Sequence, residues 1–389
     1  MSSRALILGT NENYFDEEVD DQSRTEHMHV MGATGSGKSR FLLSLIIQDI
    51  INRKGVCLID PHGELVSHVV DWLSKNEHIT QRRTVKLLQL RDTEHSFGFN
   101  PLMVQDRSSA MEINGVVART VSALAAISGD DGFDGAPLLD KTLTAVCTGL
   151  ATAGLTLVEA DFLLTPQFHS ERQQIISHIK DPVHRREWDA LDQLAKSNPK
   201  LYQEQFQAAE RRISNLIRDP LLRNIIGQQA RNLDVKACMD DREIILVDLS
   251  RQGNVVTERS ARTFGRFLIN ALTERAFERN PRDKAPFHLY IDEAHNYLSE
   301  NIPTILAECR KYGLHLTLAH QNLQQMREAG DAVFHGVMAN ARNKIVFQLE
   351  YPEDAQIMQR RIFAGKYDFM ANNGRFYQRL NRLLKIVLS

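Results

Sequence analysis

Residues 32–39 read Gly-Ala-Thr-Gly-Ser-Gly-Lys-Ser, the G-x-x-x-x-G-K-S pattern of a phosphate-binding loop. The apolar stretch Met28 to Met31 precedes them, and a run with helical character, Phe41 to Ile51, follows. Glycines let such a loop curl so that its N–H groups face phosphate oxygens, and the N-terminus of the next helix adds partial positive charge. The predicted nucleotide-binding residues are Gly32, Ala33, Thr34, Gly35, Ser36, Gly37, Lys38 and Ser39.

Two residues of this loop have specific predicted roles with ATP and Mg²⁺. We expect Lys38 to reach the β- and γ-phosphates, and the Ser39 hydroxyl to hold Mg²⁺. A chance match on a glycine-rich turn is the competing interpretation, and the strand and helix signals on either side argue against it.

A second segment supplies the acids that such a loop requires. His288-Leu289-Tyr290-Ile291 reads as a strand, and Asp292 and Glu293 follow it directly. We expect Asp292 to orient Mg²⁺, and Glu293 to orient or deprotonate the water that attacks the γ-phosphate. A surface acidic pair that caps the next helix is the alternative.

Two further polar residues complete the predicted catalytic set. The strand that ends at Ala319-His320-Gln321 would lie between the loop strand and the Asp292 strand, so Gln321 could touch the γ-phosphate or the attacking water. Arg310 could stabilise charge on the γ-phosphate of a neighbouring subunit. An ordinary polar strand end and a solvated charge at a helix end are the competing interpretations.

The segment Asp60-Pro61-His62-Gly63-Glu64 closes another predicted strand. It could adjoin the phosphates or a subunit boundary, because ligands bind at the carboxyl edge of such sheets. Equally, it could be a turn in which Glu64 favours the first turn of a helix.

The elements that must position these residues alternate along the chain. Strand-like and helical segments alternate up to about residue 95 and again from Glu243 onward, which predicts a parallel sheet covered by helices. The first predicted strands are Ala5–Leu8, Met28–Met31, Gly55–Asp60 and Val85–Leu90. Between the two alternating stretches, residues 101–234 show apolar residues at three- and four-residue spacing, which is typical of helices. Asp181-Pro182 and Asp219-Pro220 read as helix breaks there.

We therefore predict an α/β fold with an inserted helical domain. Residues 1–100 would form the first part of the nucleotide-binding core, 101–235 the all-α insertion, 236–365 the second part of the core, and 366–389 a basic C-terminal tail.

Composition restricts the other classes of function. The formal net charge of the 389 residues is −2, so overall charge does not indicate a nucleic-acid partner. The four cysteines are far apart, and their spacing suggests neither zinc nor a disulfide framework. No apolar run approaches the roughly 18 to 20 residues of a membrane span. We expect a cytoplasmic protein with no integral membrane segment.

The ordered motifs resemble those of the HerA/FtsK superfamily of ring-shaped DNA-pumping ATPases. They are GATGSGKS (32–39), IDPHGEL (59–65), FGFNPL (97–102), LYIDEAH (289–295), AECRKYGLHLTLAHQNLQQM (307–326) and ANARNKIVFQLEYPEDAQIM (339–358). Their order and spacing are most similar to those of the TraG/TraD-like coupling proteins of conjugative type IV secretion, and DPHGE also occurs in HerA-type translocases. The string DEAH also occurs in DEAH-box helicases, but the arginine-rich motif of those helicases does not occur here.

The resemblance implies a RecA-like P-loop core with helices on both faces of its sheet. It implies that Arg310 acts in trans, that Gln321 is a sensor, and that Asp292 and Glu293 are the metal-orienting and catalytic acids. It also implies a hexamer that hydrolyses ATP at subunit interfaces and moves single- or double-stranded DNA through its pore. The partners it suggests are secretion-channel proteins, a relaxase, or a nuclease or other effector. Through such partners the protein would be placed peripherally at the inner membrane.

Two basic segments are candidates for DNA contact. Residues 360–385 hold seven Lys/Arg with interleaved aromatic residues, and Arg211, Arg212 and Arg218 lie on one predicted helix. Each could equally be a solvated surface. Alternatives to DNA pumping in conjugation are a HerA-like motor that works with a nuclease or defence effector, a secretion or packaging ATPase that moves another polymer, and an ATP-gated scaffold.

Overall fold

The computed structural model describes residues 5–10, 14–128, 137–229, 232–251, 253, 255–298 and 302–362. The chain forms two compact units. Unit 1 comprises Met1–Leu88, Lys236–Ser250 and Ala276–Ser389, and unit 2 comprises Gln89–Val235 and Arg251–Arg275. The domain boundaries proposed from the sequence stay predictions, and the predicted tail, 366–389, lies outside the described residues.

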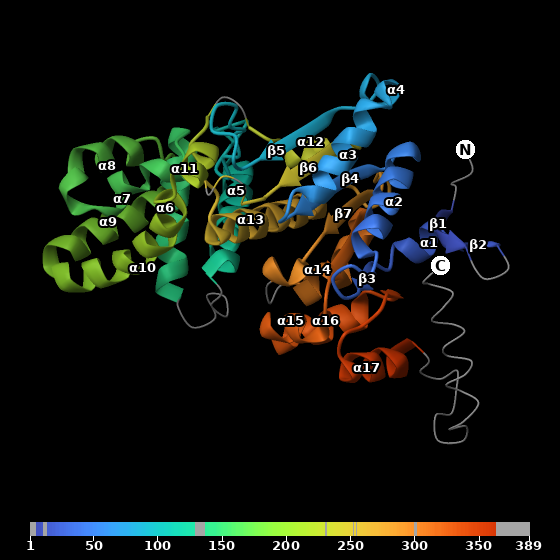
Figure 1. Cartoon of the computed structure of the whole chain (residues 1–389). Helices are drawn as coiled ribbons and strands as arrows, with labels where there is room; N and C mark the ends of the chain where they lie inside the picture. Colours follow the sequence, from blue (N-terminus) through green and yellow to red (C-terminus); the bar gives the residue numbers. More distant parts are fainter. Residues whose placement is uncertain are drawn as a thin grey trace. The chain divides into compact units, whose positions relative to one another are not determined.

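Unit 1 is built on a seven-stranded sheet (Figure 1). Across the sheet the strands follow the order β5-β6-β4-β7-β8-β3-β9. The pairs β3–β8, β3–β9, β4–β6, β4–β7 and β7–β8 are parallel, so the carboxyl ends of these strands share one edge. The strands are β3 (Met28–Met31), β4 (Gly55–Asp60), β5 (Val85–Gln89), β6 (Ile244–Asp248), β7 (Phe287–Ile291), β8 (Leu314–His320) and β9 (Asn343–Val346).

Helices cover both faces of this sheet. Every residue of β3, β4, β6, β7 and β8 is buried, as expected for parallel strands covered on both sides. On one face, apolar residues of α2 and α3 pack on alternate strand residues such as Val30, Val56 and Leu58. The helices of unit 1 are α1 (Asp21–Arg24), α2 (Lys38–Ile51), α3 (Glu64–Ser74), α4 (Glu77–Thr80), α12 (Val235–Asp240), α14 (Ile302–Glu308), α15 (Leu323–Glu328), α16 (Asp331–Asn340) and α17 (Pro352–Ile362). The predicted α/β class is confirmed.

The first predicted strand belongs to a different sheet from the one expected. β1 (Leu6–Thr10) pairs antiparallel with β2 (Asp16–Val19), which the sequence analysis missed, in a separate two-stranded sheet. Both neighbours of β3 in the main sheet are already taken by β8 and β9, so β1 has no place beside it. Instead, the amide side chain of Gln48 on α2 bonds both the N–H and the carbonyl of Ile7, each at 2.9 Å.

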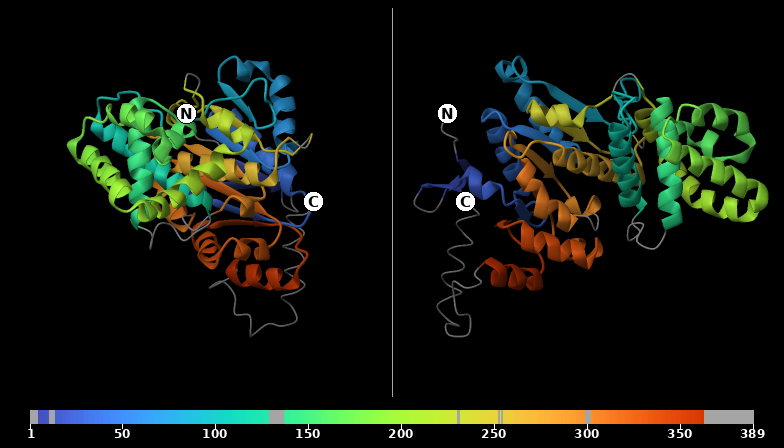
Figure 2. Two further views of the ribbon diagram at one scale, coloured as in Figure 1. Left: turned by 90° about the vertical axis from the view of Figure 1, so that its left-hand side faces the viewer. Right: turned by 180° about the vertical axis from the view of Figure 1, so that it is seen from behind.

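Unit 2 is helical (α5 to α11 in teal to yellow-green and α13 in gold in Figures 1 and 2). Asp181 and Asp219 each accept a hydrogen bond from a first-turn N–H group, with proline at the first helical position. The Asp-Pro pairs that were predicted as breaks therefore also begin helices. The helices are α5 (Ala110–Ser128), α6 (Pro137–Ala153), α7 (Asp161–Leu164), α8 (His169–Ile176), α9 (Pro182–Ser197), α10 (Pro199–Ile217), α11 (Pro220–Ile226) and most of α13 (Glu258–Phe277).

Among the residues that the structure describes, no helix has both the length and the apolar character that crossing a bilayer requires.

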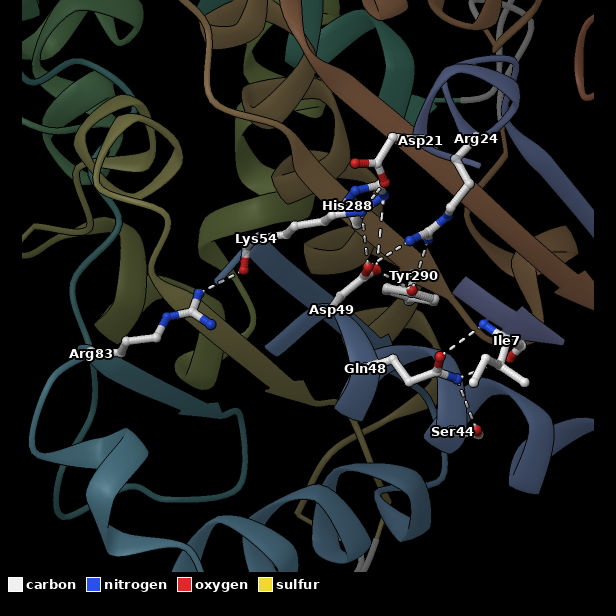
Figure 3. A network of polar contacts seen from close by, with 10 residues as sticks. All are labelled: Ile7, Asp21, Arg24, Ser44, Gln48, Asp49, Lys54, Arg83, His288 and Tyr290. Atoms are coloured by element: carbon white, nitrogen blue, oxygen red, sulfur yellow. Dashed lines mark hydrogen bonds and ion pairs between the residues drawn. The ribbon is translucent and has the colours of Figure 1, made fainter. Parts of the chain in front are cut away.

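A buried polar network joins α1, α2 and β7 (Figure 3). The carboxylate of Asp49 on α2 accepts hydrogen bonds from Arg24 at 2.5 Å and from the Tyr290 hydroxyl at 2.5 Å. Lys54 and His288 approach the same carboxylate at 3.9 Å. Arg24 and Asp49 are almost fully buried, so each charge depends on the other for compensation.

We expect Asp49→Ala to destabilise unit 1 by about 3 to 5 kcal/mol, because it leaves the Arg24 guanidinium buried without its carboxylate. Urea or thermal unfolding followed by circular dichroism measures the change. The exposed Asp71→Ala on α3 is the matched control, with an expected change within about 0.5 kcal/mol. Equal effects of the two substitutions would contradict a stabilising role for the network.

Candidate active site

The predicted phosphate loop joins β3 to α2 at the carboxyl edge of the sheet. Gly37, the residue before α2, has φ 97°, a left-handed conformation that glycine adopts without strain. Ala33 N–H donates to the Gln348 carbonyl at 2.9 Å, which ties the loop to the end of β9. No described side chain caps α2, so the N–H groups of its first turn are available to an anion.

Gly32 marks a close approach of the loop to its surroundings. A Cβ atom at this position would lie 2.7 Å from the Cβ of Phe347 and 2.6 Å from the Ser36 hydroxyl. Any side chain here would therefore displace the loop from the chain that follows β9.

The predicted acid pair follows β7 directly. The Asp292 N–H donates to the Ile59 carbonyl of β4 at 3.1 Å, and the Glu293 N–H donates to the Asp292 carboxylate at 3.0 Å. Glu293 has φ 45°, a left-handed conformation that is uncommon for a residue with a side chain. Such strained positions concentrate at functional sites.

The Lys38 ammonium joins the loop to the acids. Its Nζ atom lies 3.0 Å from Glu293 Oε1 and 3.7 Å from Asp292 Oδ1, and all three side chains are at most 8% exposed. Lys38 lies more than 250 positions from the two acids in the sequence, and the fold places all three in one buried ionic cluster.

Gln321 completes this cluster. β8 lies between β7 and β3, so the predicted position of its tip between the acid strand and the loop strand is confirmed. The Gln321 amide donates to Glu293 Oε1 at 3.0 Å. Its backbone N–H donates to the Gln325 side chain at 3.0 Å, which fixes Gln321 at the start of α15.

Burial and the Lys38 charge act in opposite directions on the two acids. Burial raises the pKa of Asp292, and the Lys38 ammonium offsets this only in part. Burial also acts to raise the pKa of Glu293, but Lys38 and the hydrogen bond from Gln321 outweigh it, so that pKa lies below its ordinary value. Glu293 is therefore ionised at neutral pH, as a residue that accepts a proton from water must be.

Two histidines that the sequence analysis did not assign to the site lie beneath the loop. The Nε2 atoms of His29 on β3 and His320 on β8 are 2.5 Å apart, and His320 Nδ1 lies 2.7 Å from the Asn322 carbonyl. Burial lowers the pKa of His29 well below its usual range and that of His320 to about 4, so both rings are neutral at pH 7. His320 Nδ1–H then donates to Asn322, and His29 Nε2–H donates to His320. The signal in the sequence that could have identified these two residues is that each is a histidine within a largely apolar strand.

The Asp60 segment forms a turn before a helix, which was one of the two interpretations of its sequence. The Asp60 carboxylate accepts hydrogen bonds from the N–H groups of His62 and Val66 at 2.8 and 3.0 Å, and α3 begins at Glu64. Because β4 and β7 are adjacent parallel strands, this turn lies at the same sheet edge as the acids, and the Asp60 charge acts to raise the pKa of Asp292.

Arg310 lies away from this cluster. It belongs to the 3₁₀ turn Cys309–Tyr312, which precedes β8, and its guanidinium lies 3.7 Å from Glu26, just before β3. This is the amino edge of the sheet, whereas Lys38 and Gln321 lie at the carboxyl edge. The Arg310 side chain is 45% exposed.

The chemistry of the site fits a nucleotide with Mg²⁺. The hydroxyl of Ser36 is buried with no hydrogen-bond partner among the described residues, beside an uncapped helix N-terminus and a lysine ammonium. The described residues hold no group of three or more His, Cys, Asp or Glu that could bind a metal. A hydroxyl at Ser39 and a carboxylate at Asp292 suit an ion whose other ligands are phosphate oxygens and water.

We expect Lys38→Met to destabilise the protein at pH 8 by about 3 kcal/mol, and less at pH 5, because it leaves buried carboxylates uncompensated. In the wild type, the pKa of Glu293 is lower in the folded state than its ordinary value of 4.5. The ionised carboxylate therefore stabilises the fold above pH 4.5, and this stabilisation is lost as the pH falls through the lowered pKa. Without Lys38, burial raises that pKa, so the destabilisation grows as pH rises.

Thermal unfolding at the two pH values measures this effect. The double variant Lys38→Met/Glu293→Gln should recover part of the lost stability at pH 8, since it removes one uncompensated charge. A loss that is the same at both pH values would contradict the ionic origin.

The family model for conjugative DNA transfer by the type IV secretory system matches residues 7–369. Among solved structures, the unbound bacterial conjugative coupling protein TrwBdeltaN70 has a TM-score of 0.59 at 14% identity, covering 88% of this chain and 73% of that chain. TrwB with ADP and Mg²⁺ has a TM-score of 0.57 at 14% identity over the same shares of the two chains.

VirB4 of Thermoanaerobacter pseudethanolicus has a TM-score of 0.56 at 14% identity, over 94% of this chain and 90% of that one. No curated protein sequence matches this chain. The likeness to these structures confirms the RecA-like ATPase fold that the motifs predict. Because the family model spans nearly all 389 residues, the chain belongs to the conjugative DNA transfer family of the type IV secretory system.

Proposed function

We propose that this protein is an ATPase that works as a homo-hexamer and moves DNA through a central pore during conjugative transfer. The observation that carries the proposal is the buried cluster of Lys38, Glu293 and Gln321 beside an uncapped phosphate loop. Membership of the family supports DNA as the polymer that is moved. TrwB has been solved in complex with GDPNP, with ADPNP, and with ADP and Mg²⁺. We extend nucleotide and Mg²⁺ to this chain on the strength of its loop.

In this proposal each side chain has one task. The loop N–H groups and Lys38 would bind the phosphates, and Ser39 and Asp292 would hold Mg²⁺, whose charge would stabilise the phosphoryl oxygens. Lys38 Nζ bonds to Glu293 Oε1 in the present structure, so a phosphate that draws the ammonium away leaves that carboxylate free to accept a proton from water. Gln321 would remain to orient Glu293 and the water.

The position of Arg310 supports hydrolysis between subunits. Arg310 lies at the amino edge of the sheet, whereas the phosphate loop lies at the carboxyl edge. Arg310 therefore cannot complete the site of its own chain in this conformation. An exposed arginine here suits a partner's γ-phosphate, where an arginine in trans stabilises transition-state charge.

A net charge of −2 is compatible with DNA pumping, because a pore repeats each local contact in every subunit. The proposed protein partners are secretion-channel components and a relaxase, as the resemblance to coupling proteins implies.

We expect Glu293→Gln to lower DNA-stimulated ATP turnover by at least about a hundredfold, because it removes the proton acceptor. ATP should bind at least as tightly as to the wild type, because the Glu293 carboxylate no longer competes with the phosphates for the Lys38 ammonium. Phosphate release and equilibrium binding of a fluorescent ATP analogue measure the two effects. The exposed Glu308→Gln is the matched control and should retain turnover. Wild-type turnover in the Glu293 variant would exclude the proposed mechanism.

A mixing experiment tests the role of Arg310. We expect Arg310→Ala and Lys38→Ala each to lower turnover by roughly 10³-fold, consistent with the usual contribution of an arginine in trans. Mixing the two chains should restore part of the turnover, because some interfaces then combine an intact loop with an intact Arg310. The neighbouring exposed Lys311→Ala serves as the control and should stay active. If the mixture is no more active than its components, Arg310 does not act in trans.

A further inference from the structure

A cavity of about 400 Å³ lies within unit 2, among α5, α10 and α13. Its charged lining consists of Arg212 on α10 and of Glu258, Arg259, Arg262 and Arg266 on α13. The volume falls in the range of small-ligand pockets, and the lining holds four guanidinium groups against one carboxylate.

Three of these arginines share one face of α13. Arg259, Arg262 and Arg266 follow one another at spacings of three and four residues, which places neighbours side by side on a helix. Like charges at these spacings destabilise a helix. An anion in the cavity would remove this repulsion.

The single carboxylate is already shared. Glu258 Oε1 accepts a hydrogen bond from Arg262 at 2.7 Å, and its Oε2 accepts one from Arg251, outside the lining, at 3.4 Å. Among the described residues, this carboxylate forms no hydrogen bond with Arg259 or Arg266.

Arg266 is one of the partly buried members of this set of charges. Its Nε–H is buried and has no acceptor among the described residues. Burial, and then the charge of Arg262, lower the pKa of Arg266, although an arginine remains protonated at pH 7. The guanidinium is therefore partly desolvated without the anion that would compensate it.

The chemistry of the lining favours a phosphoryl group. Guanidinium forks match phosphoryl oxygens in bidentate geometry, and a phosphate offers more oxygens to converging arginines than a carboxylate does. Asn215 and Thr263 add an amide and a hydroxyl that suit the same oxygens. We propose that this cavity binds a phosphoryl anion, either a backbone phosphate of a nucleic acid or the phosphate of a free nucleotide.

This site is separate from the phosphate loop and does not require ATP hydrolysis, so it can be tested without assuming the proposed function. The test variant is Arg259→Gln/Arg266→Gln in the full chain. The matched control is Arg185→Gln/Arg186→Gln, which removes two exposed arginines of α9 outside the cavity lining. Because the phosphate loop is unchanged in all chains, differences between the two variants report on the cavity.

We expect the test variant to bind a fluorescent single-stranded 20-nucleotide DNA about tenfold more weakly in anisotropy titrations without nucleotide. Its log–log salt dependence should flatten by roughly 0.7 for each lost phosphate contact. The control should bind within about twofold of the wild type. The single variant Arg259→Gln, at an exposed position, should show an intermediate loss of about threefold.

A second arm separates the two sources of phosphate. If inorganic phosphate raises the melting temperature of the wild type and the control but not of the test variant, while DNA binding is equal in all three, the ligand is a free phosphate or nucleotide. The proposal is overturned if neither DNA nor phosphate distinguishes the test variant from the control. It is also overturned if only polyglutamate binding depends on these arginines, since that result would indicate an acidic protein partner.

Discussion

The contact between the Lys38 ammonium and the carboxylates of Glu293 and Asp292 is the constraint on which the site depends. These charges are buried, so each needs the others to be compensated. The contact also requires a sheet in which the loop strand and the acid strand lie close together with their carboxyl ends at one edge. The order β7-β8-β3 and the parallel pairing meet this requirement, and they bring Gln321 to the same point.

This requirement explains how the fold accommodates a large helical unit. Residues 89–235 and 251–275 lie outside unit 1, yet β4 pairs with β6 on one side and with β7 on the other. Register in a parallel sheet depends on the hydrophobic pattern of the strands rather than on the length of the connections between them. A long connection costs little additional loop entropy, so the core tolerates the interruption.

The parts of the fold that could be predicted from sequence are those with strong local signals. β3 and β4 were predicted at their observed bounds, because each is an apolar run between clear helix and turn signals. The loop and the acid pair were predictable because their chemistry fixes both residue types and spacing. The position of Gln321 followed from the expected strand order rather than from any local feature.

Other features depend on tertiary contacts that local patterns do not contain. β2 is an acidic segment, Asp16–Val19, that becomes a strand only by pairing with β1. The His29–His320 contact and the Asp49 network join residues far apart in the chain. The short helices α15 and α16 were missed, and six residues of α15 give too little periodicity to identify a helix.

β8 links the two edges of the sheet. Arg310 lies in the turn before this strand, and Gln321 follows its last residue, His320. All seven residues of β8 are buried, and the strand is hydrogen-bonded to β7 and β3, so it cannot bend independently of its neighbours. Under the proposed function, this one fixed strand would hold at its carboxyl end the glutamine beside the phosphates of its own chain, and at its amino end the arginine offered to a neighbouring subunit.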